Sequence, residues 1–132
     1  MTAVLLFAHG SPVAEANEGI ATLARQVAER LGAGFVLPAF LDSSPPDLGM
    51  AMEEAVRRGA RRVVIMPYFL TMGLHLRRDL PVLVARQRAR FPGLEILVSD
   101  SLEGLPGMVD AVADRVREAL ARNERPAGRS MT

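Results

Sequence analysis

The sequence predicts an α/β fold, a three-layer sandwich around a four-stranded parallel sheet of order 2-1-3-4. Four short apolar segments alternate along the 132-residue chain with four segments in which apolar residues recur at helical spacing. The links between them are short, which favours parallel strands joined by right-handed crossovers. This order places the first and third strands side by side, next to the switch point where open α/β sheets bind ligands.

The four predicted strands are rich in aliphatic and β-branched residues and show almost no alternation of polar and apolar positions. They span residues 3–8, 35–41, 62–70 and 95–99. Continuous hydrophobicity of this kind is typical of parallel strands that helices cover on both faces. The strands therefore predict a buried central layer.

Apolar residues at helical spacing predict the first two helices. Between the first two strands, an apolar stripe runs from Ile20 to Leu31, and Gly32 supplies a residue that commonly ends a helix. The second helix is expected to follow Asp47 and to end at Gly59.

The third helix is expected to begin after His75, because Asp79 and Pro81 are typical of a first helical turn. A fourth apolar stripe precedes a polar C-terminal segment that contains a proline and a glycine. We therefore predict one α/β domain and a flexible tail. The boundaries are 1–122 for the domain and 123–132 for the tail.

Composition excludes several classes of function. The formal net charge is +1 and all 16 basic residues are arginine, so neither nucleic-acid binding nor lysine chemistry is expected. No apolar stretch approaches the length of a membrane span, and no basic segment precedes the first strand, so we expect no membrane insertion and no signal peptide. The absence of cysteine excludes disulfides and thiolate metal sites. These features favour a cytoplasmic protein.

The chain contains only two histidines, and each follows an apolar strand at a glycine-containing turn. His9 follows the first strand, and His75 follows the third strand and its turn. Since neighbouring parallel strands end at the same edge of a sheet, both imidazoles are expected at the ligand-binding end. Two such imidazoles form a metal site or an acid–base pair, whereas the alternative for each is a structural histidine bonded to a carbonyl group.

Three further residues have both a functional and a structural interpretation. Ser11 is expected to cap a helix that begins near residue 12 or 13, where open N–H groups favour an anion. Asp79 either orients the ring of His75 from one turn away or only supports the helix start. Asp42 is either a third metal ligand or an ordinary turn aspartate, and the two interpretations are about equally supported.

Taken in order, the motifs resemble the small form of the class II cobalamin/siroheme chelatases, the CbiX-type family. The resemblance covers residues 3 to about 120, and the spacing between the two histidine motifs makes it specific. It rests on Leu5-Leu6-Phe7-Ala8-His9-Gly10-Ser11, Ala39-Phe40-Leu41-Asp42 with Pro46, Gly59-Ala60-Arg61-Arg62-Val63-Val64-Ile65-Met66-Pro67-Tyr68-Phe69-Leu70, and Gly73-Leu74-His75 with Arg78-Asp79-Leu80-Pro81.

The resemblance implies a lyase that inserts Co²⁺, Fe²⁺ or Ni²⁺ into sirohydrochlorin, a tetrapyrrole rich in carboxylates. His9 would accept a proton and bind the metal, and His75 would be the second metal ligand. The family likeness also implies a homodimer with its site between or facing the subunits, and no cofactor beyond the metal substrate. The expected tetrapyrrole-binding residues are Gly10, Ser11, Leu70, Thr71, Met72, Gly73 and Leu74.

The sequence leaves the metal, the pathway and two rival functions open. Pro12 and Pro45 stand where the family often has arginine and glutamate, and Asp42 stands where glutamate is common. One rival is a carrier that binds a metal or a tetrapyrrole without catalysis. The other is a structural module in which both histidines are satisfied by the protein itself.

Overall fold

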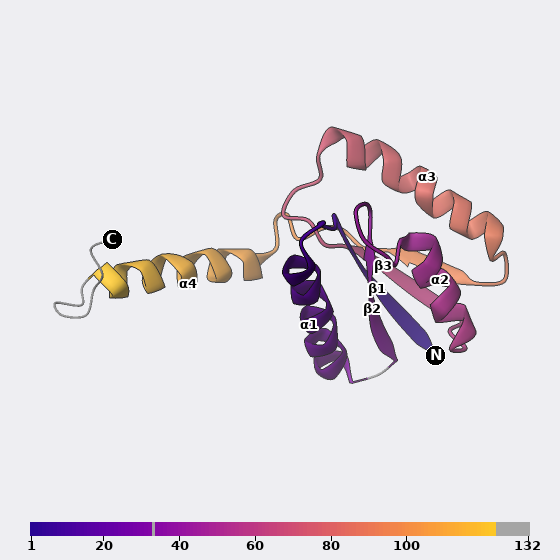
Figure 1. Ribbon diagram of the computed structural model, residues 1–132, viewed down its shortest axis with the longest axis horizontal. Coiled ribbons are helices and arrows are strands. Elements are labelled where there is room, and N and C mark those ends of the chain that lie inside the picture. The colour runs from indigo at the N-terminus through magenta and orange to yellow at the C-terminus, as the bar shows by residue number, and fades with distance from the viewer. Residues whose placement is uncertain (33, 124–132) are drawn as a thin grey trace.

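The computed structural model, which describes residues 1–32 and 34–123, has the predicted alternation of strands and helices (Figure 1). The sheet is parallel throughout and its order is β2-β1-β3-β4, as the sequence predicts. The elements are β1 (Thr2–Ala8), α1 (Ala14–Leu31), β2 (Phe35–Phe40), α2 (Leu48–Arg57), β3 (Arg62–Pro67), α3 (Leu74–Arg90), β4 (Glu95–Val98) and α4 (Pro106–Asn123).

Local chemistry explains the end of α1 and the start of α2. Gly32 ends α1 in the left-handed conformation, with φ of 71°, and its N–H bonds to the Ala28 carbonyl. Asp47 caps α2, since its carboxylate accepts a hydrogen bond of 2.9 Å from the N–H of Met50.

The predicted start of the third helix was wrong. Gly73 is the N-cap and α3 begins at Leu74, so His75 lies in its first turn and Pro81 lies inside the helix. The third strand also stops at Pro67 rather than at residue 70. Pro67 has no N–H, and the chain turns there, with the N–H of Phe69 bonding to the Pro67 carbonyl at 3.0 Å.

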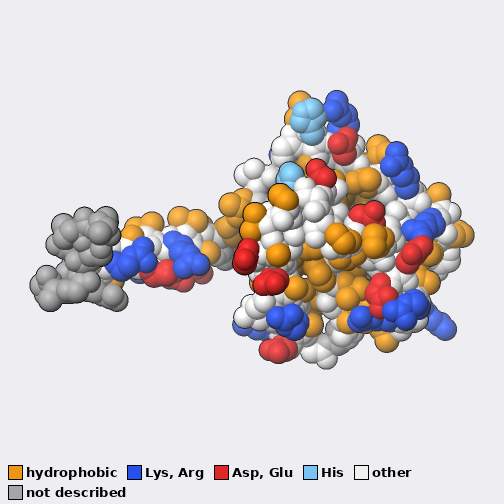
Figure 2. All heavy atoms as spheres, in the orientation of Figure 1, with side chains coloured by type: hydrophobic (Ala, Val, Ile, Leu, Met, Phe, Trp, Pro, Cys, Tyr) orange, Lys and Arg blue, Asp and Glu red, His pale blue; other side chains and the backbone are white. Residues whose placement is uncertain are grey.

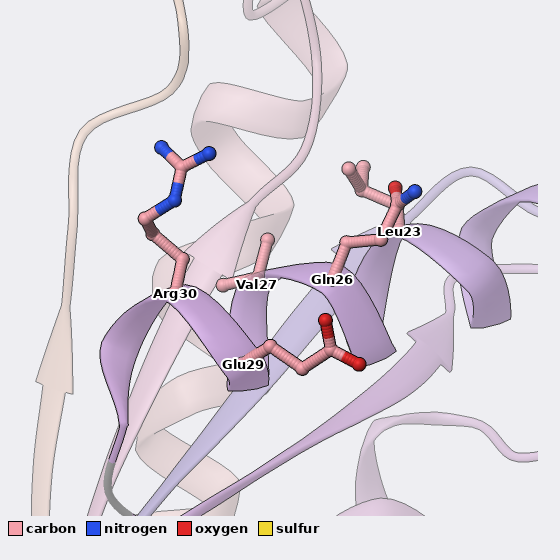
Figure 3. A pocket seen from close by; sticks show the side chains of 5 residues that line it. All are labelled: Leu23, Gln26, Val27, Glu29 and Arg30. Carbon is pink, nitrogen blue, oxygen red and sulfur yellow. The ribbon is translucent and has the colours of Figure 1, made fainter.

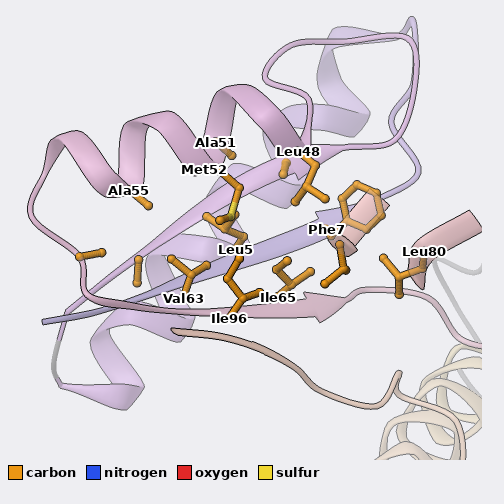
Figure 4. Close-up of a cluster of buried hydrophobic side chains, with 14 of the residues drawn as sticks. Leu5, Phe7, Leu48, Ala51, Met52, Ala55, Val63, Ile65, Leu80 and Ile96 are labelled. Atoms are coloured by element: carbon orange, nitrogen blue, oxygen red, sulfur yellow. The ribbon is translucent and has the colours of Figure 1, made fainter. Parts of the chain in front are cut away.

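One face of the sheet carries the main core, which α2 and α3 cover (Figure 4). Alternate residues of β1 point to this face, including Leu5 and Phe7, and both are almost fully buried. They pack in one cluster with Met52 of α2 and Leu80 of α3. This face therefore has the close packing expected of a domain interior.

The opposite face is only half covered. Helix α1 packs on β1 and β2, where Ala24 is buried, but Leu97 of β4 remains 43% exposed beside Val64 of β3. A hollow of about 710 Å³ runs along α1 (Figure 3). Its lining residues follow helical spacing: Leu23, Gln26, Val27, Glu29 and Arg30.

Helix α4 projects away from the rest of the structure (Figure 1). None of its residues, all of which belong to the described part of the chain, is buried. One side of the projecting helix is apolar and the other is charged (Figure 2). The apolar stripe consists of Leu105, which precedes the helix, and Val109, Val112, Val116 and Leu120, all at least 50% exposed.

The last described residue is Asn123, which ends α4, so all but the first residue of the predicted tail lies outside the described residues. None of the helices within the described ranges is long and apolar enough to cross a bilayer.

Candidate functional site

His9 lies at the carboxyl end of β1, in a turn that the backbone of the next strand holds in place. The N–H of Leu41 bonds to the Ala8 carbonyl at 2.8 Å, and the N–H of Asp42 bonds to the His9 carbonyl at 3.0 Å. Gly10 has φ of 90°, and a Cβ atom there would lie 2.0 Å from the Asp42 carbonyl oxygen. This close approach requires glycine, so the position of His9 is set by backbone contacts.

The turn after His9 is closed by a residue that the sequence analysis did not identify. Asn17 accepts from the N–H of Ser11 at 3.1 Å and donates to the Ser11 carbonyl at 2.7 Å. The predicted cap at Ser11 was wrong, since Val13 is the N-cap and α1 begins at Ala14. Ser11 Oγ instead accepts from the N–H of Val13 at 3.0 Å. A serine followed six residues later by an asparagine is not a recognised capping motif. The sequence pattern therefore did not predict this contact.

The side chain of His9 is exposed and rests against an aromatic ring. The His9 and Phe69 rings meet edge to face with centroids 6.4 Å apart, and Phe69 meets Phe7 in the same manner at 6.3 Å. Phe69 in turn packs against the core cluster. The imidazole therefore has a fixed apolar support on one side and solvent on the other.

His75 is also exposed, but a charged side chain fixes its ring. Arg78 Nη2 lies 2.9 Å from His75 Nδ1. A guanidinium can only donate, so Nδ1 is the acceptor and, in the neutral ring, Nε2 carries the proton. Of the two interpretations of Asp79, the structure does not support orientation of the imidazole, because the carboxylate faces Arg78 Nε at 3.8 Å.

Asp42 has the contacts of a turn aspartate. Its carboxylate accepts a hydrogen bond of 2.7 Å from the N–H of Ser43, which adopts a positive φ of 69°. A hollow of about 390 Å³, which Asp42, Ser44 and Met50 help to line, opens at this end of β2. Among the described residues no three histidine, aspartate or glutamate side chains form a cluster that could hold a metal. Asp42 and the two histidines thus do not form a preassembled three-ligand centre.

The segment between β3 and α3 presents apolar side chains beside His75. Leu70 is 65% exposed and Leu74 is 79% exposed, whereas Met72 packs against the core cluster. Arg77 Nε donates to the Met72 carbonyl at 3.0 Å and holds this segment. The two pale-blue patches in Figure 2, which are the two histidine side chains, emerge at the same end of the molecule. This end therefore offers two imidazoles and an apolar surface suited to a flat ligand.

Comparisons with known proteins identify relatives over almost the whole chain. The CbiX family profile matches residues 3–119. The chain is 31% identical over 121 residues to the chloroplastic sirohydrochlorin ferrochelatase of Arabidopsis thaliana, covering 92% of this chain and 54% of the relative. It is 31% identical over 132 residues to the sirohydrochlorin cobaltochelatase of Saccharolobus solfataricus, covering 93% of this chain and 99% of the relative.

A solved structure supports the same relationship. The sirohydrochlorin chelatase of Bacillus subtilis subspecies spizizenii, in complex with cobalt, superposes with a TM-score of 0.81 at 26% identity. The match covers 89% of this chain and 50% of the Bacillus chain. The chain thus spans about half the length of the Arabidopsis and Bacillus relatives, and nearly the full length of the Saccharolobus relative.

Proposed function

The chain belongs to the CbiX family, and on that premise we propose that it is a lyase that inserts a divalent metal into sirohydrochlorin. The observation that carries the proposal is the placement of His9 and His75. Both imidazoles are exposed at one end of the sheet, beside an apolar segment. The alternative of two buried structural histidines does not account for this exposure.

In the proposed reaction, two pyrrolic protons leave the macrocycle while a hydrated cation loses its water ligands. His9 and His75 first bind the metal; as the ion passes to the ring nitrogens, the freed neutral imidazole of His9 accepts one pyrrolic proton and solvent water takes the other. The backbone contacts of Gly10 fix the His9 turn, so the metal is held where the ring nitrogens must arrive. Nitrogen ligands of intermediate softness bind the ion without retaining it permanently.

The tetrapyrrole is proposed to lie over the segment between β3 and α3 and the turn after β1. Exposed apolar side chains such as Leu70 and Leu74 support a flat ring system. The half-exposed residues Gly10 and Ser11, beside His9, are proposed to contact its edge. Thr71, Met72 and Gly73 complete the proposed binding segment. Asp42 remains a candidate third ligand through Oδ2, since only its Oδ1 accepts the bond from the Ser43 N–H.

The metal is proposed to be Co²⁺, with Fe²⁺ and Ni²⁺ as alternatives, and it is a substrate of the reaction. No other cofactor is proposed, because metal insertion transfers no electrons. Similar nitrogen sites bind several divalent ions, and the supply in the cell selects among them. A cytoplasmic location is part of the proposal, consistent with a chain that has no cysteine for disulfides.

The test is metal insertion followed by the absorbance of sirohydrochlorin with each of the three ions. We expect the wild-type protein to exceed the uncatalysed rate and His9→Ala to lose most of that excess. Equal rates for both proteins would contradict the proposal. Tight binding of metal and tetrapyrrole without rate enhancement would instead support the rival function, a non-catalytic carrier.

We also propose that two copies of the chain associate. The apolar stripe of α4 and the half-covered face at Val64 and Leu97 are complementary, and each lacks a partner within the described residues. A helix that follows β4 is expected to cover that face. The segment before α4 is held at the body, since the N–H of Leu102 bonds to the Phe69 carbonyl at 3.3 Å, so α4 points outward. Docking of α4 onto a second copy would cover both surfaces.

Single cysteines test this association without background because the native chain has none. Val112→Cys and Leu97→Cys proteins, prepared separately and then mixed, should be joined by a short thiol cross-linker into dimers of one variant with the other. If α4 folds back onto its own sheet, only a chain carrying both cysteines will be cross-linked, and it will remain a monomer. The mass measured in solution should be that of a dimer for the wild-type protein and that of a monomer for Val112→Asp.

A further inference from the structure

One contact in the first turn of α3 opposes metal binding at His75. The Nδ1 atom accepts from Arg78 Nη2 at 2.9 Å, so its lone pair is already engaged. In the neutral ring Nε2 then carries the proton and has no lone pair to offer. A metal ion can therefore bind His75 in this arrangement only after Arg78 moves away.

Arg78 is held loosely by its other contacts. Its side chain is 68% exposed, and its Nε lies 3.8 Å from the Asp79 carboxylate, beyond hydrogen-bond distance. The adjacent Arg77 differs, because it donates to the Met72 carbonyl at 3.0 Å and faces the Glu103 carboxylate at 3.9 Å. Arg78 is thus the arginine of this turn that can change partners without disturbing the segment before α3.

A guanidinium prefers a carboxylate to a neutral imidazole. Two parallel N–H groups can bind both oxygens of a carboxylate, and the charges attract, so this pairing is stronger than a bond to a neutral ring nitrogen. Leu74, which is 79% exposed, lies in the same helical turn as Arg78 and would contact the apolar ring system. A macrocycle resting there would bring its peripheral carboxylates close to the guanidinium.

We propose that Arg78 masks His75 until a carboxylate of the macrocycle draws the guanidinium away and leaves Nδ1 available to the metal. The inference rests on the proposed function and adds a coupling to it: tetrapyrrole binding raises the metal affinity of the site. Linkage requires the reverse as well, so metal binding strengthens tetrapyrrole binding. No proton needs to move, since Nε2 keeps its proton while Nδ1 becomes the ligand.

The size of the effect follows from the population of masked molecules. A net hydrogen-bond stability in the upper part of the ordinary range keeps roughly nine molecules in ten masked. The apparent dissociation constant of the metal rises by the inverse of the unmasked fraction. Removing the guanidinium should therefore raise the affinity for Co²⁺ alone about tenfold.

The first experiment titrates Co²⁺ into the full chain without tetrapyrrole. Arg78→Met should bind about tenfold more tightly than wild type. Arg86→Met, which removes the same charge from an exposed position of the same helix, is the matched control and should bind like wild type. In a protein that carries His75→Ala, adding Arg78→Met should give no further gain in Co²⁺ affinity. Unchanged affinity in Arg78→Met, or an equal gain in Arg86→Met, would overturn the masking proposal.

The second experiment follows the His75 ring nitrogens by NMR with no metal present. In wild type the Nδ1 resonance should show the shift of a hydrogen-bond acceptor, and Arg78→Met should remove that shift. Adding metal-free sirohydrochlorin should move the wild-type resonance to the position seen in Arg78→Met. An Nδ1 resonance that stays unchanged both in Arg78→Met and on addition of sirohydrochlorin would contradict the proposal. Neither experiment needs turnover, so masking without metal insertion would support this inference while refuting the proposed function.

Discussion

The two histidines of the site are positioned by different means. His9 follows a strand and is fixed by its backbone, through the close approach of Gly10 to the Asp42 carbonyl and two hydrogen bonds from the residues that follow β2. His75 lies in the first turn of a helix, and its ring is fixed by the exposed side chain of Arg78. Displacing His9 requires movement of the sheet edge, whereas releasing His75 requires only a rotamer change. The proposed site therefore combines a rigidly placed imidazole with an adjustable one.

This difference suits a site that must bind a metal and then release it. In the proposed reaction the rigid imidazole would fix the point of proton transfer, and the adjustable one would change its availability with the ligands present. Four experiments separate the two kinds of positioning, and their expected effects decrease from the loss of His9 to a change at Asp42.

The largest effect is expected for His9→Ala, which removes both the proposed proton acceptor and a metal ligand. We expect metal insertion to fall by about a hundred- to ten-thousandfold, the usual range for loss of a general base. His75→Ala should reduce the rate less and should mainly raise the metal concentration needed for half-maximal rate. Steady-state kinetics with Co²⁺ distinguish these results. A larger rate loss in His75→Ala would reverse the assignment of roles.

Gly10→Ala tests whether the backbone positions His9. The new Cβ would meet the Asp42 carbonyl oxygen at 2.0 Å and would sit at φ of 90°, so the turn must shift. We expect a loss of at least about 2 kcal/mol in the free energy of unfolding and a roughly hundredfold loss of activity. Gly93→Ala is the matched control, because nothing lies within 4 Å of its added Cβ. The control should have near-wild-type stability in chemical denaturation and near-wild-type activity in the insertion assay.

Asn17→Ala removes both hydrogen bonds that close the turn at Ser11. We expect the free energy of unfolding to fall by about 1–2 kcal/mol and the rate to fall by less than for Gly10→Ala. Asn17→Asp keeps the acceptor for the Ser11 N–H and loses only the donor, so its stability should be intermediate. Gln26→Ala, on the same helix, is the control. Thermal unfolding that ranks Asn17→Asp below Asn17→Ala would show that the asparagine has another role.

The smallest effect is expected for Asp42→Asn. The amide oxygen of asparagine can still accept from the Ser43 N–H, and asparagine suits this kind of turn. If Asp42 is only a turn residue, the affinity for Co²⁺ should change by less than about twofold. Calorimetric titration measures this directly. A much larger loss would make Asp42 a third metal ligand and would place a second rigid group beside His9.

The sequence predicted the position of His9 because that position depends on local pattern, and it predicted the strand order because short crossovers between parallel strands allow few arrangements. A buried apolar strand followed by His9 and Gly10 carries its own signal, and the structure confirms the order β2-β1-β3-β4. The Gly32 end of the first helix was predicted for the same reason. At the His9 turn and at the Gly32 end of α1, neighbouring residues in the sequence determine the structure.

The incorrect predictions concern side chains whose partners were chosen by three-dimensional geometry. Asp79 is a plausible partner for His75 by spacing, but Arg78 lies closer to the ring and also faces the carboxylate. Ser11 has the chemistry of a helix cap, yet the helix begins three residues later because Asn17 closes the turn. Pro81 is typical of a first turn, but the extended Gly73 starts α3 earlier.

The hydrogen bond from the Leu102 N–H to the Phe69 carbonyl has a consequence for how activity depends on protein concentration. Phe69 supports the His9 imidazole, and Leu102 lies at the base of the projecting helix. In the proposed dimer, the segment that leads into the docked helix is therefore bonded directly to the residue whose ring lies beneath the proposed base. Dilution should therefore lower the specific activity per chain while the circular dichroism spectrum is still that of the folded protein.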